Sequence, residues 1–161
     1  MRVSTFLVIT LILGVLQVVF PDYLKVFGIK PDFLLAAVVM AGLFFQMRRA
    51  VIFGVSIGIF KDIFSLNAFG LNILLFGLWA YLAAKISRKI SIEDNITRTL
   101  LVFVIALFEN IASGLSIVYS GSLIPFGIFL RIVILGSLYT ALPFALIFKI
   151  TKIIDHSVNY D

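Results

Sequence analysis

Four charged side chains lie inside strongly apolar stretches of this chain: Lys61, Asp62, Glu109 and Arg131. Side chains of these types inside a membrane can bind a solute or pair with one another. An isolated charge at the bilayer centre costs about 2.5 to 3.5 kcal/mol on insertion scales. We therefore expect each of the four to lie near a membrane surface or to have a partner of opposite charge.

Patterns of known enzyme classes are otherwise missing. The only histidine, His156, lies in the polar tail, no HExxH motif occurs, and one intramembrane aspartate cannot form an aspartyl dyad. The run Gly54 to Gly58 superficially resembles a nucleophile motif, but Ser56 lies within the predicted helix without a base, so we interpret it as packing. The chain has no cysteine, which excludes disulfides and thiolate–metal sites. We expect no catalytic residue, no cofactor and no metal.

Lys61 and Asp62 belong to an apolar stretch with regularly spaced small residues. At about 100° per residue, Gly54, Gly58, Lys61 and Ser65 share one stripe of a helix, and Asp62 flanks it. The glycine spacing lets another helix approach closely, so we expect the stripe to face protein. Two interpretations remain open for the charges. They either take part in a helix contact, or Lys61 extends toward the membrane surface while Asp62 caps or braces the next turn.

Glu109 and Arg131 are predicted to form a buried pair. Glu109 lies about 15 Å from the end of its segment at Tyr119, and Arg131 about 10 Å inside the outer end of its own. These two depths differ by less than the reach of an arginine side chain. Small and polar residues surround Glu109 on its helix face, which predicts that this face points inward: Ala106, Ala112, Ser113 and Ser116. Leucines share the face of Arg131, so an arginine extended toward the surface is the alternative.

The composition predicts an integral membrane protein of the all-α class. Of 161 residues, 62% are hydrophobic and 13% are charged, and no soluble core of this size could hide so much apolar surface. No long polar segment suggests a second domain, so we expect residues 1–161 to form one polytopic helical bundle. A net charge of +5 without a basic and aromatic patch indicates anionic lipid contact and no nucleic-acid binding.

Six transmembrane helices are predicted from the apolar runs. They cover residues 3–20, 32–47, 50–66, 69–86, 99–119 and 124–149. The first run is longer than the apolar region of a usual signal peptide, and no small-residue cleavage site follows it, so we interpret it as a span.

The distribution of basic residues predicts the orientation. Six spans place nine lysines and arginines on one side of the membrane and two on the other, which puts both termini in the cytoplasm. The nine are Arg2, Arg48, Arg49, Lys85, Arg88, Lys89, Arg98, Lys149 and Lys152, and the two are Lys25 and Lys30.

Polar and aromatic residues at the helix ends give three further predictions. Asp32 is suited to cap the second span. Gln17, the only strongly polar side chain of the first span, is expected to form a hydrogen bond between helices. Trp79 and Tyr81 lie toward the far end of the fourth span, where aromatic rings favour the membrane interface.

Three short motifs resemble the MreD family of bacterial rod shape-determining proteins. They are Pro31-Asp32-Phe33 at the start of the second span, Gly54-x-x-x-Gly58-x-x-x-Asp62-x-x-Ser65, and Phe69-Gly70-Leu71-Asn72. The chain length and the order of its apolar segments extend the resemblance to the whole sequence. Lys61 is a departure, because the family more often has an apolar residue before this aspartate.

The resemblance implies a non-enzymatic scaffold in the bacterial inner membrane that serves lateral wall elongation. Its implied partner is MreC and, through MreC, the wall synthases and the MreB filament. The family is also similar in fold to the substrate-binding subunits of energy-coupling-factor transporters, so a solute-binding membrane subunit is the alternative. For a scaffold, a small-molecule ligand is not expected.

One stretch is predicted to hold the bundle in the shape that a partner recognises. Its role would be packing and hydrogen bonding rather than catalysis. The residues concerned are Gly54, Gly58, Lys61, Asp62, Ser65, Gly70 and Asn72.

Overall fold

The computed structural model describes residues 2–19, 29–64, 70–89, 94–121 and 125–158, with side chains up to residue 145. Within these ranges the chain forms six α-helices and no β-strand, which confirms the all-α class. The helices are α1 (Val3–Val19), α2 (Phe33–Phe44), α3 (Met47–Phe64), α4 (Leu71–Lys89), α5 (Asn95–Tyr119) and α6 (Phe126–Val158).

Two of the described helices are long and apolar enough to cross a membrane: Asn95–Tyr119, which is α5, and Phe126–Ala145 within α6. Two more, α1 and α2, are apolar but shorter. These lengths agree with a membrane protein. Six crossings and the orientation stay predictions.

Helix boundaries differ from the predicted spans by three residues or more at four places, one of which is the end of α4 at Lys89, three residues past its predicted end. Phe45 adopts an extended conformation that ends α2, and α3 already begins at Met47, so Arg48 and Arg49 lie in its first turn rather than in a loop. Similarly, α5 begins at Asn95, four residues before its predicted start. In contrast, α6 continues past residue 149 to Val158, because isoleucines in the tail maintain helical apolar spacing.

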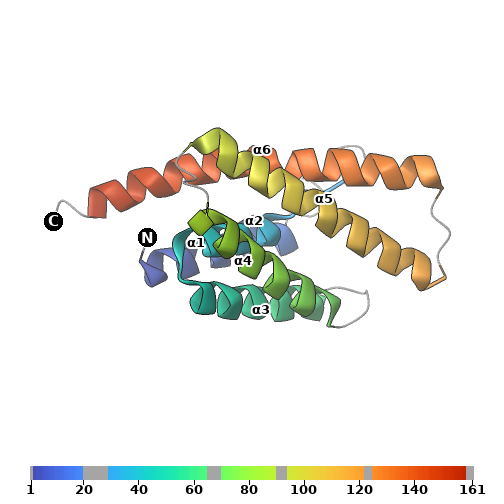
Figure 1. The fold of residues 1–161 in the computed structure, drawn as a ribbon, viewed down its shortest axis with the longest axis horizontal. Coiled ribbons are helices and arrows are strands. Elements are labelled where there is room, and N and C mark those ends of the chain that lie inside the picture. The colour runs from blue at the N-terminus through green and yellow to red at the C-terminus, as the bar shows by residue number, and fades with distance from the viewer. Residues whose placement is uncertain (1, 20–28, 65–69, 90–93, 122–124, 159–161) are drawn as a thin grey trace.

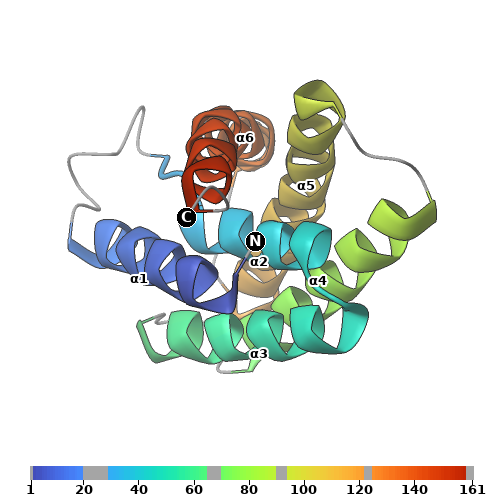
Figure 2. The same ribbon diagram turned by 90° about the vertical axis from the view of Figure 1, so that its left-hand side faces the viewer.

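The centre of the fold is α2, the shortest helix. Its twelve residues include no polar side chain, and every residue from Leu34 to Gly42 is buried. A helix that is apolar on all sides requires neighbours on all sides. Figure 2 shows α2 between α1, α3, α4, α5 and α6, and α2 contacts each of these five helices. Asp32 caps its start by accepting a hydrogen bond from the N–H of Leu35, which confirms the predicted cap.

The other helices associate mainly in pairs. The contact of α3 with α4 is the most extensive in the molecule, and that of α5 with α6 is the next. With 25 and 33 residues, α5 and α6 are the two longest helices. Figure 1 shows that the end joining α5 to α6 extends beyond α3 and α4. The main contacts of this pair with the other helices are those with α2 and α4, and they are few, so individual side chains contribute strongly to how the pair is held.

Candidate functional site: a charge cluster and a capped turn

The glycine stripe of α3 lies directly against the backbone of α4. A Cβ atom added to Gly54 would stand 2.6 Å from the carbonyl oxygen of Phe76, and one added to Gly58 would stand 2.6 Å from that of Asn72. No side chain fits at either position without moving the α4 backbone. The prediction that this stripe faces protein is therefore confirmed, and the protein it faces is the chain's own next helix.

Asp62 stands where α3 and α4 meet and binds the first turn of α4. Its Oδ2 accepts from the backbone N–H groups of Gly70 at 3.0 Å and Ile73 at 3.2 Å. Its Oδ1 accepts from the N–H of Asn72 at 3.3 Å and from the Asn72 Nδ2 at 2.6 Å. The carboxylate thus satisfies N–H groups that a helix start leaves without partners. The structure therefore supports the interpretation in which Asp62 caps or braces the next turn.

Gly70 makes this capping geometry possible. Its φ angle of +100° lies in the region that side chains disfavour, and it turns the chain into α4 with its N–H toward Asp62. Asn72 follows and is buried, with its amide on the Asp62 carboxylate. Ser65, predicted to belong to the same stripe, lies outside the described residues. Among the predicted packing residues, Gly54, Gly58, Asp62, Gly70 and Asn72 are therefore at a single helix contact.

Lys61 points away from this turn, into the protein. Its Nζ lies 2.6 Å from Oδ2 of Asp32 and 3.6 Å from Oε1 of Glu109. It also stands over the Phe76 ring, 4.5 Å from the centroid. The interpretation in which Lys61 extends toward the membrane surface is therefore wrong. We call Asp32, Lys61 and Glu109 the charge cluster.

Asp32 links the charge cluster to α1, α2 and α6. Besides capping α2, its Oδ1 accepts from the side-chain amide of Gln17 at 3.3 Å, and its backbone N–H donates to Oγ1 of Thr140 at 3.0 Å. The carbonyl oxygen of the Gln17 amide accepts from the N–H of Leu34 at 3.0 Å. The prediction that Gln17 forms a hydrogen bond between helices is confirmed. Together these bonds hold the start of α2 against α1 and α6.

Glu109 brings α4 and α5 into the cluster. It is 2% exposed, and its Oε2 accepts a 2.6 Å hydrogen bond from the indole Nε1 of Trp79. Its Oε1 accepts from the Ser113 hydroxyl at 3.4 Å. This confirms that the face of α5 around Glu109 points inward. All six helices thus contribute a residue to the charge cluster or to its hydrogen bonds.

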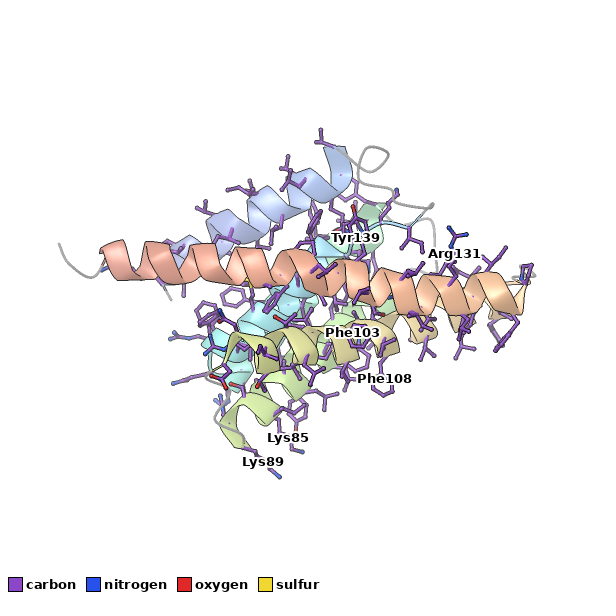
Figure 3. All side chains as sticks on the ribbon, turned by 90° about the horizontal axis from the view of Figure 1, so that it is seen from above. Lys85, Lys89, Phe103, Phe108, Arg131 and Tyr139 are labelled. Atoms are coloured by element: carbon purple, nitrogen blue, oxygen red, sulfur yellow. The ribbon has the colours of Figure 1, made fainter. Side chains whose placement is uncertain are left out.

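Two sequence predictions about these residues are wrong. The cation beside Glu109 is Lys61 of α3, whereas Arg131 is exposed on α6 and projects away from α5 in Figure 3. The ring of Trp79 does not face the outside of the molecule, as an interfacial ring would. It is 8% exposed, because its N–H binds a carboxylate in the interior.

The pair between Lys61 and Asp32 is absent from the sequence predictions above, although the sequence contains a signal for it. Consecutive helices joined by a short connection run antiparallel, so the end of α3 returns to the start of α2. That arrangement brings Lys61 next to Asp32. The hydrogen bond between Trp79 and Glu109 had a weaker signal in the sequence, because a buried indole N–H usually requires an acceptor.

The polar groups of the site are engaged in holding helices together. Asp62 is bound to the backbone and side chain of the α4 start, and Asp32 to the α2 start and Lys61. Within the described part of the chain, no three residues of the His, Cys, Asp or Glu types gather as they would to hold a metal ion. The arrangement supports the positioning of helices.

Comparison with known proteins identifies the family. The family model described as rod shape-determining protein MreD matches residues 1–154 of the 161. Neither the curated proteins nor the solved structures give a match. The match covers nearly the whole chain and includes every motif that carried the resemblance, and the chain therefore belongs to the MreD family of rod shape-determining proteins.

Proposed function

We propose that this protein is a non-enzymatic scaffold subunit of the bacterial lateral wall-elongation complex. It lies in the cytoplasmic membrane, crosses it six times and controls cell shape by binding MreC, which connects it to the wall synthases and the MreB filament. The observation that carries this proposal is the family match over residues 1–154.

The engagement of the buried polar groups supports a structural role. Both oxygens of Asp62 are occupied by the α4 start, so the carboxylate cannot act as a base or nucleophile without releasing that turn. Lys61 is likewise held by Asp32. Side chains that are bonded in this way hold the surface of the protein in one conformation. A binding partner associates more tightly with a surface that is already fixed in shape.

The positions of the basic residues support an orientation with both termini in the cytoplasm. Five exposed basic residues lie in the first turn of α3 and the last turns of α4, which are at the same end of this antiparallel pair: Arg48, Arg49, Lys85, Arg88 and Lys89. Figure 3 shows Lys85 and Lys89 projecting from the end of α4. Asp32 and Asp62 lie at the opposite end. Lysine and arginine concentrate on the cytoplasmic side of membrane proteins, so this end would face the cytoplasm.

Copurification with MreC from the same bacterium tests the proposal. Tagged wild-type protein should recover MreC from solubilised membranes. Asp62→Ala should recover several-fold less at matched amounts of folded protein, because the α4 start loses its acceptor and the bundle shape changes. Ser56→Ala is the matched control on the same helix. Its hydroxyl is exposed and donates only to the carbonyl of Ile52, so the variant should recover as much MreC as wild type.

Recovery of no MreC by the wild-type protein would contradict the scaffold proposal. If a small solute also raised its melting temperature, the solute-binding alternative would replace it. Equal recovery by Asp62→Ala and wild type would leave MreC as the partner. It would exclude the start of α4, which Asp62 binds, as a determinant of MreC binding.

A further inference from the structure

The charge cluster has unequal numbers of acidic and basic groups. Asp32 and Glu109 are carboxyl groups, and Lys61 is the single ammonium between them. If all three were ionised, the cluster would carry one uncompensated negative charge. That charge would lie mainly on Glu109, which is almost completely buried and farther from the ammonium than Asp32 is. An uncompensated charge in such a place is strongly unfavourable.

Neutral groups face the cluster from the other helices. They are Gln17 of α1, Trp79 of α4, Ser113 of α5 and Thr140 of α6. The other charged residue at this end of α3, Asp62, is directed to the α4 start, and Arg131 of α6 is exposed at the surface. A bound divalent cation would need about six oxygen ligands, whereas the direct contacts of Glu109 are an ammonium, an indole N–H and one hydroxyl. A proton needs no such shell.

We propose that Glu109 is a proton-binding site in the interior of this protein and that it holds a proton at neutral pH. The distances fit this state. Lys61 Nζ lies at 2.6 Å from Asp32, as for an ion pair, and at 3.6 Å from Glu109. The bond from the Trp79 indole to Oε2 is one that the carbonyl oxygen of a neutral acid can also accept. The 3.4 Å contact between Oε1 and the Ser113 hydroxyl can form with either oxygen as the donor, so a proton on Oε1 has an acceptor.

The charge cluster reaches the surface of the molecule at the helix ends, beside the start of α2 and the end of α3. The side chains of Lys61 and Asp32 are 21% and 19% exposed, while that of Glu109 is 2% exposed. A proton can therefore pass between solvent and Glu109 beside the Lys61–Asp32 pair. Loss of the proton would make Glu109 compete with Asp32 for Lys61 and would draw α5 toward α3. The bound proton thus sets how α5 is placed against α2 and α3.

Infrared spectroscopy of the purified protein in lipid nanodiscs tests this proposal. At neutral pH the wild-type protein should show the carbonyl stretch of one protonated carboxyl group. Glu109→Gln, which keeps the shape of the neutral acid, should lose this band. Asp94→Asn, which removes an exposed carboxyl group at the start of α5, should keep it.

Two further variants identify which carboxyl group carries the proton. Trp79→Phe removes the donor to Glu109, so the band should move to higher frequency. Gln17→Leu removes the donor to Asp32 and should leave the band in place. If folded wild-type protein shows no such band, the proposal is overturned whatever the variants show. A band that survives Glu109→Gln, or that moves with Gln17→Leu and not with Trp79→Phe, would overturn it as well.

Discussion

The contact between α3 and α4 and the contact of α5 with α2, α3 and α4 are built in different ways. Gly54 and Gly58 bring the α3 and α4 backbones together without intervening side chains. In contrast, α5 touches α2 and α4 through few residues. Beside its buried apolar side chains, polar groups hold it: Trp79 of α4 donates to Glu109, and Lys61 of α3 lies beside the same carboxyl group. The α3–α4 contact depends on the absence of side chains along its length, with Asp62 at one end, and the α5 contact depends on specific polar side chains.

The difference reflects what holds helices together in lipid. Lipid tails are as apolar as leucine, so helix association there depends on close packing and on hydrogen bonds between helices. Close packing requires small residues along the whole contact, as in α3. A polar cluster requires only a few residues at one level, as at Glu109. We infer that the two contacts stabilise the fold independently.

The largest effect is expected from removing the cation of the charge cluster. Lys61→Met keeps the length of the side chain but leaves the partly buried carboxylate of Asp32 without its ammonium. The free energy of unfolding should fall by about 3 kcal/mol, the lower end of the range for a buried pair, because both groups are partly exposed. Lys85→Met is the matched control. Lys85 is exposed and lies 5.6 Å from the centroid of the Tyr81 ring, so its loss should cost less than about 1 kcal/mol. Unfolding in mixed detergent micelles measures both. Equal losses would show that the cluster contributes nothing.

A smaller effect is expected at the glycine contact. Gly58→Ala places a methyl group 2.6 Å from the carbonyl oxygen of Asn72 and 2.7 Å from Cα of Ile73, so two backbones must separate. The expected loss is about 1 to 3 kcal/mol. Gly127→Ala in α6 is the control, since its methyl group would meet no atom within 4 Å and alanine favours helices by about 1 kcal/mol. If both variants were equally stable, the α3–α4 contact would be loose enough to accept side chains.

Local features of this fold could be predicted from sequence because local chemistry determines them. Asp32 has the residue type of a helix cap and precedes an apolar run, and the spacing of Gly54 and Gly58 is visible in one dimension. The Glu109–Lys61 contact could not be found in this way. Depth along the helices was the only coordinate available for choosing a partner, and by depth Arg131 was suitable. To identify Lys61 as the partner, one must also know how each helix is rotated about its axis and that α2 lies at the centre. Both follow only from the packing of all six helices.

Trp79 shows a second limit of the sequence. Its type and its place near the end of an apolar segment are typical of an interfacial ring, and only the neighbouring carboxylate makes the interior favourable for it. A residue whose position depends on a single distant partner cannot be placed before that partner is known.

Hydrogen–deuterium exchange in nanodiscs tests most directly whether the two contacts are independent. Backbone amides exchange faster where local packing is lost. Gly58→Ala should accelerate exchange in α3 and α4, while exchange in α5 stays as in wild type. Trp79→Phe keeps an aromatic ring but removes the donor to Glu109. It should accelerate exchange in α5, while exchange in α3 stays as in wild type. Acceleration of the same helices to the same extent by both variants would contradict the account.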